Sequence, residues 1–249
     1  MLIDTHCHLS EEYYEDLEKT IEEDFKAVDK IIISGCDKAG IDESLEIIEK
    51  YDNIFATIGY HPDQADIVTE KDLIELKKNL LLKKVVGLGE IGLDYHYGRD
   101  NRNLQIKLFE KQLAIAEELS IPVVIHSREA TEDTINTLSK YKVHGVIHAF
   151  SGSYETACKY ISMGFLLGVG GVLTFKNSKL YQVIEKLSLE NLVLETDSPY
   201  LTPHPYRGKT NSSKYIPIIA KKLAEVMKSS EEEVAEKTSK NACSVFDLI

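Results

Sequence analysis

Short runs of branched, apolar residues recur along the chain, with polar segments between them. The runs occupy positions 2–6, 30–35, 54–59, 85–90, 122–126, 145–150, 165–171 and 192–197. Most are almost continuously apolar and do not alternate with polar residues. This pattern is typical of strands that are covered on both faces in a parallel sheet. We therefore predict eight parallel strands.

Amphipathic helices are predicted between these runs. An apolar stripe at a helical spacing begins near Leu17 and a second near Ile41, and longer stripes cover 104–119 and 216–227. A last helix begins at Ser230, where Glu233 stands three residues further on, as in a capping box. Eight strands alternating with helices over 249 residues predict a single α/β domain, 1–249, with the fold of a (β/α)8 TIM barrel and an extra C-terminal helix. An open doubly wound sheet is the alternative, but no GxGxxG motif follows the first strand.

Composition and charge narrow the class of protein. Apolar residues make up 43% of the chain and charged residues 28%, as in an ordinary folded protein. The longest uncharged stretch, 160–175, contains four glycines and is too short to span a bilayer, so we expect no membrane helix. The start of the chain does not have the pattern of a secretory signal, and the four scattered cysteines are expected to be reduced thiols of a cytoplasmic protein. A net charge of −12 argues against a broad basic surface for duplex nucleic acid.

Histidines and carboxylates stand where the predicted strands end. Because side chains alternate along a strand, two histidines at the first strand end point the same way. Active sites of such barrels lie at the carboxyl ends of the strands, so potential ligands from five strand ends are expected to converge on one pocket. The six are His6, His8, Glu90, His126, His148 and Asp197.

Taken singly, each of these residues has an ordinary structural explanation. Together they would place four imidazoles and two carboxylates at one end of a barrel, which is costly unless they pair or bind a metal. Mixed nitrogen and oxygen ligands suit zinc or manganese, and magnesium less well. Six ligands exceed one tetrahedral site, so we predict two divalent metal ions (Mg, Mn or Zn) bridged by a carboxylate.

Further residues are candidates for the surroundings of the metals. His61, at the third strand end, is expected to contact substrate. Arg128 and Arg207 are candidates for binding phosphate, and solvated surface charges are the alternative for both. Asp4 and Glu195 are expected one layer below the ligands, where they support the metal site by hydrogen bonds; bonds to backbone alone are the alternative.

Six segments in this order resemble the TatD family of metal-dependent deoxyribonucleases, within the wider amidohydrolase-type barrels. The similarity covers essentially the whole chain. The segments are Ile3-Asp4-Thr5-His6-Cys7-His8, Ile58-Gly59-Tyr60-His61-Pro62, Gly89-Glu90-Ile91-Gly92-Leu93-Asp94-Tyr95, Val124-Ile125-His126-Ser127-Arg128, His148-Ala149-Phe150-Ser151-Gly152 and Leu194-Glu195-Thr196-Asp197-Ser198-Pro199-Tyr200-Leu201. One departure follows Arg207-Gly208-Lys209, where the family often has a further basic residue and a Glu-Pro pair and this chain has Thr210-Asn211-Ser212-Ser213-Lys214.

The resemblance implies a divalent-metal phosphodiesterase that acts on DNA, often from the 3′ end, with the same six residues as ligands and Glu90 as the bridge. The expected catalytic residues are Glu90 and Asp197, the latter orienting the attacking water or taking its proton. The negative charge favours single-stranded or frayed DNA ends as the partner over long duplexes.

Two alternatives remain at this stage. The same barrel hydrolyses amides, lactones or small phosphoesters in other proteins, often with a modified lysine as the bridge; Glu90 stands at that position here. The second alternative is a metal-binding scaffold without catalysis, which the intact set of ligands makes less favoured.

Overall fold

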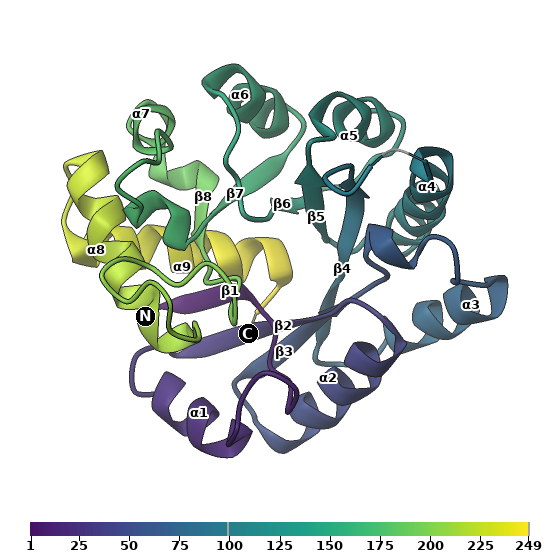
Figure 1. Ribbon diagram of the computed structural model, residues 1–249, viewed down its shortest axis with the longest axis horizontal. Helices are drawn as coiled ribbons and strands as arrows, with labels where there is room; N and C mark the ends of the chain where they lie inside the picture. Colours follow the sequence, from purple (N-terminus) through teal and green to yellow (C-terminus); the bar gives the residue numbers. More distant parts are fainter. Residues whose placement is uncertain (99, 249) are drawn as a thin grey trace.

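The protein is described by a computed structural model that covers residues 1–98 and 100–248. Eight parallel strands follow one another in sequence order around a barrel, and helices surround it (Figure 1). The strands are β1 Ile3–Cys7, β2 Lys30–Gly35, β3 Ile54–Ile58, β4 Val85–Asp94, β5 Val123–Arg128, β6 Gly145–Ile147, β7 Phe165–Val169 and β8 Leu192–Leu194. The predicted (β/α)8 barrel is confirmed.

The helices occupy the segments between the strands, as the apolar stripes predict. They are α1 Leu17–Asp24, α2 Lys38–Lys50, α3 Glu70–Asn79, α4 Arg102–Leu119, α5 Thr131–Leu138, α6 Tyr154–Ser162, α7 Tyr181–Ile184, α8 Ile216–Met227 and α9 Glu231–Phe246, with short 3-10 helices η1 Pro62–Gln64, η2 Gly171–Thr174, η3 Leu189–Asn191 and η4 Ser213–Tyr215. Ser230 caps α9 as predicted, because its hydroxyl accepts a hydrogen bond from the Glu233 backbone N–H at 3.1 Å. The Glu233 carboxylate accepts from the Ser229 hydroxyl.

Three strands, β4, β6 and β8, differ in length from their prediction by three residues or more, and these differences bear on the site. β4 continues four residues beyond Glu90, so this residue lies within the strand and not at its end. β6 and β8 end earlier than predicted, at Ile147 and Leu194. His148 and Asp197 therefore lie on the segments that follow these strands, which are free to turn toward the barrel axis.

The first and last strands meet at a seam with few backbone contacts. A single parallel bridge joins Cys7 to Ser198, and the His8 N–H donates to the Ser198 carbonyl at 2.7 Å. The Asp197 N–H donates to the His6 carbonyl at 3.0 Å. Asp4, which is fully buried, reinforces the seam by accepting from the backbone N–H and the hydroxyl of Thr196.

The C-terminal helix α9 closes the end of the barrel formed by the amino ends of the strands. The opposite end, formed by their carboxyl ends, is called the mouth. Helix α9 crosses behind the strands in Figure 1. Its buried Ala242 and Phe246 pack with the amino-terminal residues of several strands, among them Ile3, Ile32 and Val193. The Asn241 side chain donates to the carbonyls of Leu189 and Leu192, both at 2.8 Å. The extra helix thus fills the floor and leaves only the carboxyl ends of the strands open.

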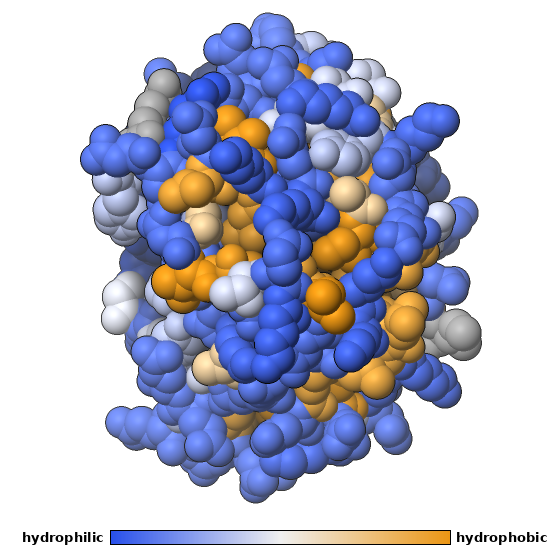
Figure 2. Space-filling model, turned by 90° about the vertical axis from the view of Figure 1, so that its right-hand side faces the viewer, coloured by the Kyte–Doolittle hydropathy of each residue, from blue (hydrophilic) through white to orange (hydrophobic). Residues whose placement is uncertain are grey.

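The outer surface is mostly hydrophilic where it is viewed from the side of α3 and α4, and apolar side chains show mainly in the grooves between polar ones (Figure 2). Amphipathic helices that bury one face on the barrel produce this pattern. None of the helices formed by the described residues is both long and apolar enough to cross a membrane.

Candidate metal centre

The six predicted ligands converge on the carboxyl side of the barrel. His6 lies within β1, Glu90 within β4 and His126 within β5, and the other three follow β1, β6 and β8. His6, Glu90 and His148 are buried, and His8, His126 and Asp197 are partly buried. Mutually close donor atoms, within 4.8 Å of one another, form the groups His6–His8–Glu90, His6–His148–Asp197 and His61–Glu90–His126.

Irregular strand pairing directs two of these side chains inward. The register of β1 against β2 shifts between Asp4 and Cys7, on either side of His6. The register of β4 against β5 shifts between Leu88 and Ile91, on either side of Glu90. Such bulges are frequent next to active sites because they re-aim a side chain without ending the strand.

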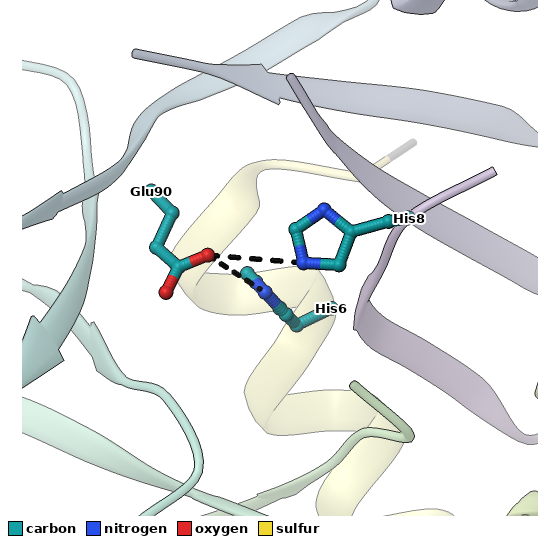
Figure 3. Close-up of side chains that lie close together, drawn as sticks. All are labelled: His6, His8 and Glu90. Carbon is teal, nitrogen blue, oxygen red and sulfur yellow. Dashed lines mark ion pairs between the residues drawn. The ribbon is translucent and has the colours of Figure 1, made fainter. Parts of the chain in front are cut away.

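Glu90 lies between two pairs of imidazoles. Its Oε2 is 3.4 Å from His6 Nε2 and 3.8 Å from His8 Nε2, and Figure 3 shows both rings facing this carboxylate. Its Oε1 is 2.6 Å from His126 Nδ1 and 2.9 Å from His148 Nε2. Each carboxylate oxygen thus faces a different pair of nitrogen donors, which is the arrangement that a bridging ligand between two cations requires.

The donor chemistry fits divalent metal ions. Both ring nitrogens of the buried His6 lack a hydrogen-bond partner, which is costly for a side chain that has nothing else to bind. Burial, followed by the nearby His148, lowers the pKa of His6, so this imidazole is kept in the neutral form that ligates metals. A metal ion placed at His6 would satisfy the unpaired nitrogen that faces Glu90.

The other charges of the centre compensate one another. Burial raises the pKa of Glu90, but His148, His126 and His6 outweigh it and hold the pKa well below its usual range. Burial likewise lowers the pKa of His148, yet Glu90 and Glu195 bring it well above its usual range. Protons and metal ions therefore compete for the same imidazole nitrogens beside these carboxylates.

Asp197 completes the mouth side of the centre. Its Oδ1 is 3.8 Å from His6 Nε2 and 3.6 Å from His8 Nε2. Its backbone is left-handed, with φ 55°, a conformation that aspartate tolerates better than most residues. Burial raises its pKa, and the neighbouring imidazoles, His8 foremost, lower it by more, so Asp197 is an ionised acceptor.

Glu195 supports one ligand from below, as the sequence suggests. Its Oε1 accepts a hydrogen bond from the Ala149 N–H at 2.5 Å and lies 3.6 Å from His148 Nδ1. This carboxylate is fully buried. A carboxylate behind a metal-ligating histidine orients the ring and raises its basicity.

Asp4 has a different position from the one expected. Besides its bonds to Thr196, it accepts from the Ser213 hydroxyl at 2.7 Å, and it reaches His6 only through the backbone N–H at 3.3 Å. The register shift that follows Asp4 turns the side chain toward the seam with β8. Asp4 therefore fixes the strand that carries His6 and does not contact the imidazole.

Asp94 is a member of the cluster to which the sequence reasoning assigned no role. Its Oδ2 is 3.0 Å from His126 Nε2, so His126 has a carboxylate at each ring nitrogen. Glu90 and Asp94 are four residues apart on one strand and share a face, a periodicity visible in the sequence once β4 is known to continue to Asp94.

Cys36, just after β2, is a second residue that was missed. Its thiol donates to Glu90 Oε2 at 3.6 Å and lies 3.9 Å from His8 Nδ1. His8 Nδ1 itself is 3.1 Å from the Ser34 carbonyl, which fixes the ring with Nε2 toward Glu90. No spacing motif marks Cys36; only its place after the second strand does.

Comparisons with known proteins identify the family of the chain. The family model described as TatD related DNase matches residues 3–247. The chain belongs to the TatD family of metal-dependent hydrolases. It is 42% identical to the metal-dependent hydrolase YabD of Bacillus subtilis, over the full length of both chains. It is 33% identical to the metal-dependent hydrolase YcfH of Escherichia coli K12, over 99% of this chain and 96% of that one.

A solved structure of the TatD family has the same fold. The crystal structure of the TatD homologue YjjV from Escherichia coli K12 superposes with a TM-score of 0.92 at 31% identity, over 100% of this chain and 98% of that one. A TatD family hydrolase from Entamoeba histolytica, at 23% identity, shares the fold with a TM-score of 0.87 over 98% of this chain and 97% of that one.

The candidate substrate contacts of this TatD protein lie in different parts of the mouth. The ring of His61 is 4.6 Å from that of His126, and its Nδ1 is 3.0 Å from Asp63 Oδ1. Arg128 is the exposed last residue of β5 and lies over the ring of Tyr97 at 5.8 Å. Arg207 lies over the ring of Phe175 at 4.1 Å in the loop after β8.

The loop that departs from the usual TatD pattern has a structural role. Asn211 and Ser212 are buried. The Asn211 amide donates to the carbonyls of Thr196 and Tyr200, and the Ser212 hydroxyl donates to Asp24 at 2.6 Å. These residues anchor the loop at its base, and the exposed part before them carries the basic residues.

A cavity of about 370 Å³ opens beside the TatD metal centre, on the side of β3 and β4. His61 and Asp94 lie where it borders the centre. The other lining residues are Asp63, Asp66, Tyr97, Gly98, Asp100, Asn101 and Gln105. Four aspartates and, among the described residues, no lysine or arginine line this cavity.

Proposed function

We propose that this protein is a metal-dependent phosphodiesterase that cleaves DNA from single-stranded or frayed ends, from the 3′ end as the family resemblance implies. The position of Glu90 between two pairs of imidazoles carries the proposal. The family model, with its description as a DNase, supports the substrate class.

The proposed ligands are His6, His8, Glu90, His126, His148 and Asp197, with two divalent ions of Mg, Mn or Zn. Such ions lower the pKa of a water and stabilise charge on a phosphoryl oxygen. Glu90 holds the two halves of the site together, and Glu195 orients His148 from behind.

Asp197 is the proposed general base. It is ionised, and its Oδ1 faces the nitrogens of His6 and His8 at the mouth side of the cluster. An ionised carboxylate at this place can hold the attacking water by a hydrogen bond and accept its proton. His61 and Arg128 are the proposed contacts of the phosphate, and Arg207 that of a neighbouring one.

The test is hydrolysis by the purified protein after removal of metal and re-addition of Mg²⁺, Mn²⁺ or Zn²⁺. Substrates are linear single-stranded DNA, RNA, bis(p-nitrophenyl) phosphate and carboxylic esters. We expect metal-dependent cleavage of DNA, and loss of at least about 100-fold in kcat/KM for His126→Ala and Glu90→Gln because each removes a donor of the centre.

His96→Ala is the matched control for these variants. This histidine lies at the same mouth but pairs with Glu129 at 2.7 Å, outside the cluster. Circular dichroism and the melting temperature show that each variant is folded. Hydrolysis of esters or lactones without hydrolysis of phosphodiesters, or full activity of either variant, would contradict the proposal.

A further inference from the structure

Exposed tyrosines gather at the mouth of the barrel. The chain has 13 tyrosines, and the most exposed of them all lie in segments that follow a strand or at the first residue of the next helix. Tyrosines at the opposite end are only partly exposed, such as Tyr51 and Tyr141. The exposed set consists of Tyr13, Tyr97, Tyr154, Tyr181, Tyr200 and Tyr206.

Two of these tyrosines lie in a row that leads from the candidate metal centre to the surface. The ring of Tyr200, 53% exposed, is 6.3 Å from the ring of His8. The ring of Tyr13 is 6.0 Å from that of Tyr200. Tyr13 follows β1 and Tyr200 follows β8, so the row His8–Tyr200–Tyr13 extends outward over the seam of the barrel.

Charge varies around the mouth. The loop after β1, which carries Tyr13, is acidic, with exposed Glu11, Glu12, Glu15 and Asp16. The segments after β7 and β8, residues 171–184 and 198–214, contain Lys176, Lys179, Arg207, Lys209 and Lys214 and no aspartate or glutamate. We call this the basic sector. Arg207 and Lys209 are exposed, and each lies over an aromatic ring, Phe175 at 4.1 Å and Tyr206 at 5.4 Å.

The opposite part of the mouth is acidic. Because the strands follow one another around the barrel, β3 and β4 lie across from β7 and β8 (Figure 1). The end of β4 and the segments after β3 and β4 line the cavity with Asp63, Asp66, Asp94 and Asp100, which we call the acidic sector. Arg128, at the end of β5, lies at the edge of this sector, over the ring of Tyr97. Arg99, in the loop after β4, is outside the described residues.

We propose that the bound DNA strand lies across the basic sector with a base stacked on Tyr200, and that it ends at the acidic sector. This inference rests on the proposed function. Bases stack on exposed aromatic rings irrespective of their identity, and each stacked base contributes substantially to binding of single strands. Arg207 and Lys209 neutralise phosphates of this strand, and the scissile phosphate lies at the metal centre.

The acidic sector explains why the strand ends there. A strand that continued past the metal centre would bring further phosphates beside four aspartates in a protein of net charge −12. Repulsion between the phosphates and these carboxylates disfavours binding. A terminal nucleoside without a following phosphate does not meet this repulsion. The protein is therefore an exonuclease because of its charge pattern, and a circular strand is a poor substrate.

The first experiment compares KM and kcat of the metal-loaded protein for a linear single-stranded oligonucleotide with those for bis(p-nitrophenyl) phosphate, which has no base. We expect Tyr200→Ala to raise the KM ratio of oligonucleotide to small ester about 5- to 100-fold, and Tyr200→Phe to restore it, because the ring is what stacks. Lys209→Glu should raise the same ratio and reduce the slope of log affinity against log salt by about 0.7, the value for one phosphate contact.

Matched controls are Tyr51→Ala and Lys83→Glu, at the opposite end of the barrel. The inference is overturned if Tyr200→Ala and Lys209→Glu behave like these controls, or if they impair both substrates by the same factor. If the wild-type protein does not hydrolyse DNA in a metal-dependent way, the proposed function fails, and this inference fails with it. If the wild-type protein is active but the variants behave like the controls, only this inference fails.

A second experiment tests the acidic sector with linear and circular single strands of the same sequence. The wild-type protein should degrade the linear strand and leave the circle largely intact. The double variant Asp66→Asn, Asp100→Asn should cleave the circle at least several-fold faster, because two charges that repel the continuing strand are gone. Equal rates on circle and linear strand in the wild type would contradict the inference.

Discussion

At the scale of single residues, Gly168 in β7 shows how a missing side chain positions a carboxylate. A Cβ atom at this position would lie 2.1 Å from Glu195 Oε2, far inside van der Waals contact. The space that glycine leaves is the space that Glu195 fills on its way to His148 and the Ala149 N–H. Gly168 thus acts by allowing close approach of a neighbouring side chain.

The effect of burial on Asp24 can be tested by measuring how stability depends on pH. Its Oδ1 accepts from the Ser212 hydroxyl and the Lys214 N–H, and its buried Oδ2 has no hydrogen-bond partner. Burial raises the pKa of Asp24 from 3.8 to about 6. Between these values the unfolded chain loses the proton before the folded one, so this residue makes folding less favourable as the pH rises through that window.

We therefore expect the melting temperature of Asp24→Asn, relative to wild type, to be higher at pH 8 than at pH 4. The difference between the two proteins cancels the titration of all other groups. Thermal unfolding followed by circular dichroism at both pH values measures it. A difference that is constant or falls with pH would show that Asp24 is not held in its neutral form by burial.

The sequence pattern predicted which candidate ligands lie close together, but not the directions in which their side chains point. Polar residues at the ends of the predicted strands indicated His148 and Asp197, because strand ends share one face of a barrel. Glu90 and His6 depend on register shifts, which arise from pairing between distant segments and leave no local mark. The contact of Asp94 with His126 depends on the length of β4 in the same way.

At the scale of secondary-structure elements, α9 stabilises the barrel by packing buried side chains against its floor. Phe246 is 2% exposed and fills the barrel floor beside Ala242. We expect Phe246→Ala to lower the free energy of unfolding by about 3–5 kcal/mol, because it removes buried apolar surface and leaves a cavity. Urea denaturation measures the change.

Leu81→Ala is the control for this prediction. Leu81 is 71% exposed, and its loss should change the free energy of unfolding by no more than about 0.5 kcal/mol. A similar loss for both variants would mean that α9 does not contribute to the barrel floor in solution. The amphipathic pattern of α9 and its Ser230 cap were visible in the sequence; its packing across the floor was not, since periodicity shows which face is buried but not against what.

At the scale of the whole molecule, the metal centre should link stability to metal and pH. Ligands come from both ends of the chain, and a metal that binds only the folded state stabilises it by about 2.7 kcal/mol at 100 times its Kd. We expect Mn²⁺ or Zn²⁺ to raise the melting temperature of the wild-type protein, and His6→Ala to lose most of this shift.

The same shift should be larger at pH 8 than at pH 5. The pKa of His148 is well above its usual range, so a metal must displace a proton from this imidazole into solvent, which is easier as the pH rises. Calorimetric unfolding with and without metal at both pH values checks this. An equal shift in His6→Ala, or a larger one at pH 5, would place the stabilising ion elsewhere.

The weak seam between β8 and β1 has a consequence for the order of events during synthesis. Asp197 is translated long after His6 and His8, and one backbone bridge with a few polar contacts brings their strands side by side. A nascent polypeptide therefore lacks one of the proposed donors until Asp197 has been added. An ion bound across this junction would fasten together two segments that are far apart in the sequence.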